Sequence, residues 1–129
     1  MPPEWTNPPG VVAPAAHYWH VARAGNTLYI SGQLGVDENG NAVGIGDARA
    51  QARQAWKNLV AILAAYGATP RHLVKTNTYI THIAYRPLVG EARDEVFPGP
   101  PYPPSTLVVV TSLAEPHFLV EIEGVAVLD

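Results

Sequence analysis

The sequence contains no cysteine, and this absence excludes several kinds of chemistry at once. A chain without thiols forms no disulfide, has no thiolate nucleophile and offers no cysteine-based metal site. Charge is also scarce: only 15% of the residues are charged, and 8 basic and 11 acidic residues give a net charge of −3. We expect no nucleic-acid partner, because phosphate neutralisation by basic side chains supplies most non-specific affinity for nucleic acids.

Long apolar runs are missing as well. The sequence has no stretch of about 18 apolar residues that could span a membrane, and its N-terminus lacks the basic-then-apolar pattern of a secretion signal. We therefore expect a cytoplasmic protein without a membrane segment. With 129 residues, of which 47% are hydrophobic, residues 1–129 are predicted to form a single domain with a substantial core.

Proline and glycine mark the ends of the predicted elements. Residues 1–16 contain five prolines and are predicted to be an extended arm rather than a strand or helix. Two strands follow, joined by a turn at residues 24–26. In the second strand, alternation predicts that Leu28, Ile30 and Leu34 share one face. The opposite face is predicted to carry Thr27, Tyr29, Ser31 and Gln33.

Apolar residues at steps of three and four predict two helices. The first spans residues 46–67, with Asp47 as its N-cap and Gly67 in the left-handed conformation after its last turn. The second spans residues 85–97, with Pro87 in its first turn. Its apolar stripe is predicted to be Leu88, Ala92 and Val96. Together with strands at residues 72–83, 105–110 and 117–128, this order predicts an α+β fold, a mixed β-sheet with two helices packed on one face.

The last strand carries two acids in an unexpected place. Residues 120, 122, 124, 126 and 128 form a wholly apolar face, as expected beneath helices. The other face has Glu121 and Glu123 between apolar residues, which suits neither a solvated face nor a buried one. This pattern predicts a face covered by another subunit, with a polar cavity in it. The alternative interpretation is a pair of partly exposed, salt-bridged acids on an edge strand.

Four stretches together resemble the RidA family, also called the YjgF or endoribonuclease L-PSP-like family. They are "APAAHYWHV", "LYISGQLGVDENG", "ARQAWKNLVAILAAYGATPRHLVKTNTYI" and "VEIEGVAV". The resemblance implies a chorismate-mutase-like fold, a homotrimer, and clefts between subunits that bind a small-molecule ligand. It also implies hydrolysis of 2-imino or 2-enamino acids to 2-keto acids and ammonia, without a metal or an organic cofactor.

The resemblance also assigns roles to particular residues. The family's catalytic acid falls on Glu121, its aromatic residue on Tyr18 and its glycine backbone donor on Gly32. Glu121 would position a water and transfer protons, with a pKa raised by burial and by the nearby Glu123. We expect Glu123 to be structural, paired with a basic or hydroxyl group across the subunit interface.

The family's arginine, which binds the substrate carboxylate, is missing. Its position falls on Ser105, followed by Thr106 and Leu107, while the family's helix asparagine falls on Gly90. A guanidinium binds a carboxylate bidentately, which a neutral side chain cannot do. Ser105 and Thr106 suit a neutral or weakly polar ligand group, or a carboxylate held mainly by backbone donors. Two functions follow: an imine or enamine deaminase with an altered substrate, or a ligand-binding or regulatory trimer without catalysis. Arg86 or Arg93 in the second helix are candidate replacements for the arginine.

No metal site is expected. His17 and His20 lie three residues apart, which on a strand places them on opposite faces. Zinc sites need three or four converging ligands, and the segment offers no cysteine or nearby acid to complete one.

Overall fold

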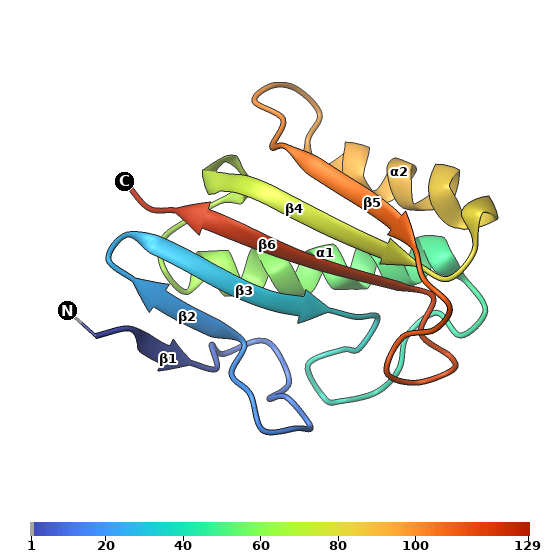
Figure 1. Cartoon of the computed structure of the whole chain (residues 1–129), viewed down its shortest axis with the longest axis horizontal. Coiled ribbons are helices and arrows are strands. Elements are labelled where there is room, and N and C mark those ends of the chain that lie inside the picture. The colour runs from blue at the N-terminus through green and yellow to red at the C-terminus, as the bar shows by residue number, and fades with distance from the viewer. Residues whose placement is uncertain (1) are drawn as a thin grey trace.

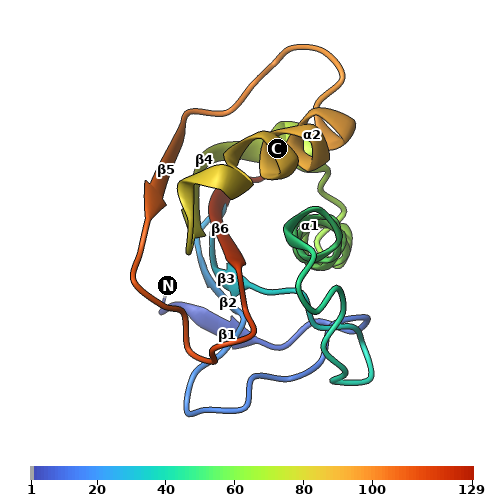
Figure 2. The same cartoon turned by 90° about the vertical axis from the view of Figure 1, so that its right-hand side faces the viewer.

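Two helices cover one face of a six-stranded mixed sheet in the computed structural model, which describes residues 2–129 (Figure 1). Both helices lie on the same side of the sheet (Figure 2), so the expected α+β fold class is confirmed. The helices are α1 (Ala48–Ala64) and α2 (Arg86–Val96), and short 3₁₀ helices at Pro70–His72 and Ile83–Tyr85 precede β4 and α2. The strands are β1 (Glu4–Thr6), β2 (Val21–Ala24), β3 (Thr27–Gln33), β4 (Leu73–Ile80), β5 (Ser105–Val109) and β6 (Val120–Val127).

The C-terminal strand β6 lies in the interior of the sheet. The strand order is β1-β2-β3-β6-β4-β5, and only the pair β4–β5 is parallel. Because β3 and β4 both run antiparallel to β6, α1 connects two strands of the same direction, as α2 does. Such crossovers share one handedness, so two of them that advance across the sheet in the same direction place their helices on the same face.

Helix α1 forms as its sequence predicts. The side chain of Asp47 accepts a hydrogen bond from the amide of Ala50 at 3.0 Å, and Gly67 has a φ of +69°. Both end signals are therefore confirmed. Its apolar stripe packs against the sheet, and the buried members are Ala52, Ala55, Trp56, Leu59, Ile62 and Leu63.

Helix α2 begins as predicted but buries a slightly different face. Pro87 lies in the first turn, and the fully buried residues are Val89 and Ala92. The prediction that Leu88 leads the buried stripe was wrong, because Leu88 is only half-buried and lies outside the core cluster. Steps of three and four from Val89 lead to Ala92 and Val96, and this row packs on the core.

The N-terminal arm contains a strand that the prolines did not predict. Residues Glu4–Thr6 pair antiparallel with β2, in the register Glu4↔Arg23 and Thr6↔Val21. The prediction of an arm without an element was therefore wrong at this point. The three residues lie between two proline pairs, so their own amides remain able to donate, and the short strand is at the sheet edge, where nearby proline is tolerated.

A β-bulge interrupts β3 beside β6. Ile30 is paired with Gly124, but the next pair is Gln33 with Ile122. Between these two pairs β3 therefore contains one residue more than β6. Gln33 therefore turns to the helix-covered face, where it is 2% exposed and its side-chain amide donates to His20 Nδ1. The prediction that Gln33 lies on the same face as Tyr29 was wrong, because simple alternation stops at the bulge.

Candidate active site

The two glutamates of β6 project from the face of the sheet that lies opposite the helices, called here the open face. Ile122 between them and the alternate residues Val120, Gly124 and Ala126 are buried on the helix-covered face, as alternation predicts. Glu121 and Glu123 are both half-buried, and neither forms an ion pair among residues 2–129. Because β6 is an inner strand, the alternative of salt-bridged acids on an edge strand is wrong.

Glu123 has a fixed partner within its own chain. The hydroxyl of Tyr79 on β4 donates a hydrogen bond to Glu123 Oε1 at 2.5 Å. The expected hydroxyl partner is therefore present, but it comes from a neighbouring strand rather than from across a subunit interface. This hydrogen bond is the main reason why the pKa of Tyr79 is raised above its ordinary value, because a phenolate would face the carboxylate of Glu123. Burial of Tyr79 is the second cause.

Glu121 has a different environment, because it packs against the bulge of β3. A Cβ atom placed on Gly32 would lie 2.2 Å from Glu121 Oε2, so only glycine leaves room for the carboxylate. Burial raises the pKa of Glu121, and repulsion from the charge of Glu123 raises it further. The two predicted residues Glu121 and Gly32 are thus in direct contact, and the acid is shifted towards the range useful for proton transfer.

Tyr18 lies on the same face of the sheet but is not beside Glu121. It is 51% exposed and lines a cavity of about 520 Å³ together with Ser31 and Glu123, which we call the aromatic cavity. Three more exposed aromatic side chains line it, namely Trp5, Trp19 and Tyr29. Neither Glu121 nor Gly32 is among the lining residues. The open face therefore combines an acid, a glycine contact and an aromatic wall.

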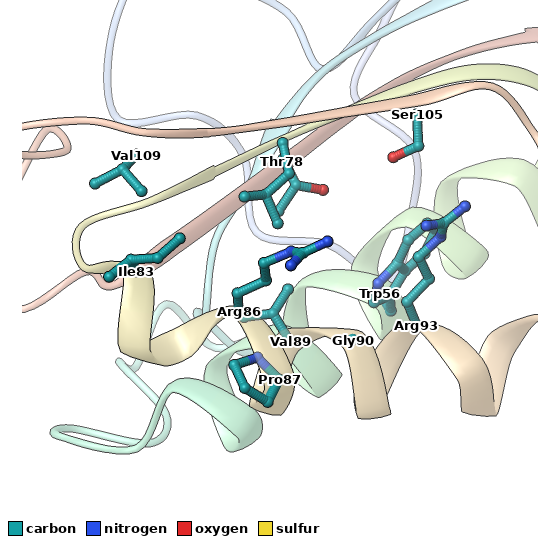
Figure 3. Close-up of a pocket in the computed structure, with 11 residues that line it drawn as sticks. Trp56, Thr78, Ile83, Arg86, Pro87, Val89, Gly90, Arg93, Ser105 and Val109 are labelled. Atoms are coloured by element: carbon teal, nitrogen blue, oxygen red, sulfur yellow. The ribbon is translucent and has the colours of Figure 1, made fainter.

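Three of the other predicted binding residues lie on the opposite side of the sheet. Ser105, Leu107 and Gly90 line a cavity of about 920 Å³ between β5 and α2, which we call the α2–β5 cavity (Figure 3). Arg86 and Arg93 line it as well, and both side chains extend from α2 towards β5. The two candidate replacement arginines thus line the same cavity as Ser105, where we expect the family's arginine to fall.

Thr106 is separated from its neighbour Ser105 by the alternation of β5. Thr106 is paired with Asn77, and its Oγ1 accepts a hydrogen bond from Lys75 Nζ at 2.8 Å. Lys75 is paired with Val125, which is on the open face. The predicted site residues therefore form two groups: those around Glu121 on the open face, including Thr106, and those around Ser105 in the α2–β5 cavity.

Sequence reasoning missed a buried glutamine that holds the chain just before Glu121 in place. Gln51 on α1 is 1% exposed, and its Nε2 donates to the carbonyls of Gly44 and His117 at 3.0 and 2.9 Å. Its Oε1 accepts from the amide of Leu119 at 2.8 Å, which fixes the chain two residues before Glu121. The signal in the sequence is a polar residue on the apolar stripe of α1, where an unpaired amide would be costly.

The part of the chain that the structure describes has neither a metal-binding cluster nor a membrane-spanning helix. Residues 2–129 contain no cluster of three histidine, cysteine or acidic side chains able to hold a metal ion. Over the same residues, neither helix has the length and apolar character needed to cross a membrane.

Comparison with known proteins finds one family over almost the whole chain. The model of the endoribonuclease L-PSP family matches residues 10–128. The chain is 33% identical over 116 residues to a 2-iminobutanoate/2-iminopropanoate deaminase from Dermatophagoides farinae, covering 90% of this chain and 89% of that protein. It is 32% identical over 126 residues to the 3-aminoacrylate deaminase RutC from Acinetobacter baylyi, covering 98% of each. Among solved structures, YyfA from Yersinia pestis, of the Rid protein family, has a TM-score of 0.91 at 29% identity, covering 98% of this chain and 99% of that one.

Proposed function

The chain belongs to the endoribonuclease L-PSP family, which is the RidA family, and we propose that it hydrolyses a small reactive imine or enamine in a cleft between two subunits. Two relatives that are at least 32% identical carry names of this chemistry, one for 2-imino acids and one for the enamine 3-aminoacrylate. The observation that carries the proposal is the environment of Glu121, a half-buried carboxyl with a raised pKa packed against Gly32.

Such a carboxyl suits both halves of an imine hydrolysis. The carboxylate form of Glu121 takes a proton from water while the water oxygen bonds to the imine carbon. The protonated form then gives that proton to the nitrogen, which yields a carbinolamine. The same carboxyl moves the hydroxyl proton to the nitrogen, and the carbon–nitrogen bond breaks as the carbonyl forms and ammonia leaves. An enamine joins the same route after protonation at carbon. General acid–base catalysis is most effective when the pKa lies near the working pH, and the upward shift of the pKa of Glu121 is in that direction.

We propose a homotrimer because the two groups of site residues lie on opposite faces of one sheet. A single chain does not bring Ser105 next to Glu121, but the open face of one subunit against the α2–β5 cavity of another would. In that arrangement Tyr18 would close the cleft over the ligand, and Gly32 would offer its backbone amide. The half-buried Val125 and the exposed Val127 on the open face supply apolar area for the contact.

A second candidate function has one observation in its favour. Ser105 stands at the position of the family's substrate-binding arginine, so the cleft would hold a ligand without the usual carboxylate anchor. The alternative is a trimer that binds a small molecule and regulates another process without turnover. Such a protein would need the cleft but would not need Glu121 as an acid–base group.

Ammonia release separates these two functions. We expect ammonia from 2-iminobutanoate or 3-aminoacrylate generated in the assay by a coupled enzyme, at a rate that depends on the amount of this protein. Glu121→Gln should lower this rate by at least about 100-fold, the usual contribution of a positioned acid–base group. Release that is unchanged in Glu121→Gln, or absent for every imine and enamine tried, would leave the binding function as the better interpretation.

Mixed trimers test whether the site lies between subunits. Nothing lies within 4 Å of a Cβ atom on Gly90, and Gly90 lines the α2–β5 cavity, so Gly90→Phe directs a ring into this space. In trimers assembled from an equal mixture of Gly90→Phe and Glu121→Gln chains, about a quarter of the clefts combine two unaltered halves. We expect about that share of wild-type activity, although each variant alone is inactive. An inactive mixture would mean that both residues act within one chain.

A further inference from the structure

The α2–β5 cavity has an unbalanced positive charge. Its lining contains Arg86 and Arg93 and no acidic residue. Neither arginine forms an ion pair among residues 2–129. Both extend into the space in front of β5 rather than along the outer surface of the helix (Figure 3).

Two of the three acids of α2 form ion pairs away from the cavity, and the third, Asp94, is exposed and is not among the lining residues. Glu91 forms an ion pair with Arg49 of α1 at 2.6 Å, and Glu95 forms one with Arg53 at 2.6 Å. Arg53 correspondingly lowers the pKa of Glu95. Helix α2 therefore presents Glu91 and Glu95 to α1 and its two arginines to the cavity.

Two further hydrogen-bond donors belong to residues that line the same cavity. Trp56 lines it and is 2% exposed, yet its indole Nε1 is buried without a hydrogen-bond partner. Buried donors of this kind are rare, because each costs free energy unless an acceptor satisfies it. The hydroxyl of Ser105 is the second donor.

The helix itself adds to the attraction for anions. Arg86 is the first residue of α2, whose first turn has no acidic residue and whose N-cap, Tyr85, makes no side-chain capping bond. The N-terminal end of a helix carries a partial positive charge, which favours an anionic group there. Arg93 is two turns further on, near Trp56 and Ser105 (Figure 3). Between them Gly90 has no side chain, which leaves the space between the two guanidinium groups open.

We propose that Arg86 and Arg93 form a double clamp for a substrate with two carboxylates, an imino or enamino dicarboxylic acid. One carboxylate lies at Arg93, near Ser105 and the Trp56 indole, and the other lies at Arg86 by the start of α2. The two residues are about 10 Å apart along the helix axis. Arginine side chains are long and flexible, so both guanidinium groups can reach the two ends of a short dicarboxylate across this distance. This inference rests on the proposed function for the reaction, but the clamp itself concerns only binding.

Binding of simple carboxylates to the intact protein tests the clamp. In ¹⁵N-labelled protein, the indole signal of Trp56 is assigned by elimination with Trp5→Phe and Trp19→Phe, since both of these side chains are more than half exposed. Glutarate is the dicarboxylate probe, and butanoate and inorganic phosphate are the comparisons, all at one ionic strength so that screening is constant. We expect glutarate to shift the Trp56 signal and to bind at least about tenfold more tightly than butanoate, the usual effect of one further charge-assisted pair.

The variants Arg86→Gln and Arg93→Gln give the decisive comparison. Each should weaken glutarate binding by roughly tenfold or more, while Arg71→Gln, an exposed arginine outside the cavity, should leave it unchanged. Equal affinity for glutarate and butanoate would overturn the proposal. So would phosphate binding as tight as glutarate, an Arg71→Gln effect as large as the others, or an indole signal that glutarate does not move.

The two proposals fail separately. A protein that binds glutarate through Arg86 and Arg93 but releases no ammonia from any imine or enamine keeps the clamp and loses the deaminase. A protein that deaminates 2-iminobutanoate at a rate and KM unaffected by Arg86→Gln and Arg93→Gln keeps the deaminase and loses the clamp.

Discussion

Replacing Glu121 with glutamine should change stability in a direction that depends on pH. The folded protein raises the pKa of this carboxyl, chiefly through burial and secondly through repulsion from Glu123. A group whose pKa is raised on folding stabilises the protein below its unfolded pKa and loses that contribution as the pH rises through the folded value. At pH 7 the carboxyl is ionised in the unfolded chain, so the raised pKa in the folded protein opposes folding there, and glutamine avoids this cost. We expect Glu121→Gln to match the wild type near pH 4 and to exceed its stability at neutral pH.

The spacing of the two acids gives the size of the repulsive part of this effect. Residues two apart on a strand lie about 7 Å apart, and two unit charges at that distance repel by roughly 0.6 kcal/mol in water and 2.4 kcal/mol at an effective dielectric of 20. For half-buried groups a gain of about 1 kcal/mol is reasonable, and this corresponds to roughly 3–5 °C in Tm for a domain of this size. Glu123→Gln removes the same repulsion but weakens the bond from Tyr79, a loss of similar size, so little net change is expected.

Thermal unfolding from pH 4 to 8, at one protein concentration, measures both variants side by side. Concentration must be fixed because subunit association makes Tm concentration-dependent. The ammonia assay on the same preparations should show that Glu121→Gln has lost turnover and Glu123→Gln has kept most of it. If Glu121→Gln is less stable than the wild type at every pH and remains active, Glu121 is a structural residue and the proposed mechanism is wrong.

Three other substitutions test neighbouring parts of the site. Gly32→Ala should displace the carboxylate of Glu121, because the new Cβ would lie 2.2 Å from Oε2; activity should fall at least about 100-fold with normal circular dichroism, and full activity would exclude this contact from the site. Tyr79→Phe should lower the unfolding free energy by about 1 kcal/mol at neutral pH. This loss should vanish as the pH rises through the raised pKa of the tyrosine, which absorbance at 295 nm follows. Ser105→Arg should improve binding of 2-imino acids by roughly tenfold to a hundredfold, seen as a lower KM; an unchanged KM would mean that Ser105 is outside the substrate cleft.

Periodicity predicted most of the fold because it reports burial directly. The stripe on α1 and the apolar face of β6 are fixed by which side chains must leave water, and both are as predicted. The cap at Asp47 and the left-handed Gly67 were predictable for the same local reasons. Glu121 and Glu123 were recognised because two carboxylates interrupt an otherwise apolar strand, which burial alone does not explain.

Three features were beyond sequence periodicity. The bulge that turns Gln33 inwards has no period of its own, since it depends on the pairing with β6. In α2, Leu88 and Val89 are both apolar and both give steps of three or four to Ala92 and Val96, so only packing on α1 decides between them. The short strand β1 depends on an available edge at β2 rather than on its own propensity.

The register of the sheet explains why the substrate-binding half can change without the catalytic half. Residues paired across neighbouring strands share a face, so Glu121, Tyr79 and Val108 project together. Ser105 precedes Val108 by three positions, an odd number, and therefore belongs to the opposite face. A substitution at Ser105, or on the facing side of α2, changes the charge of the cavity without touching the packing that raises the pKa of Glu121. The expected absence of the family's arginine at Ser105 is therefore compatible with the proposed proton transfer, provided that another cation in the cavity holds the substrate, and Arg86 and Arg93 are the cations that line it.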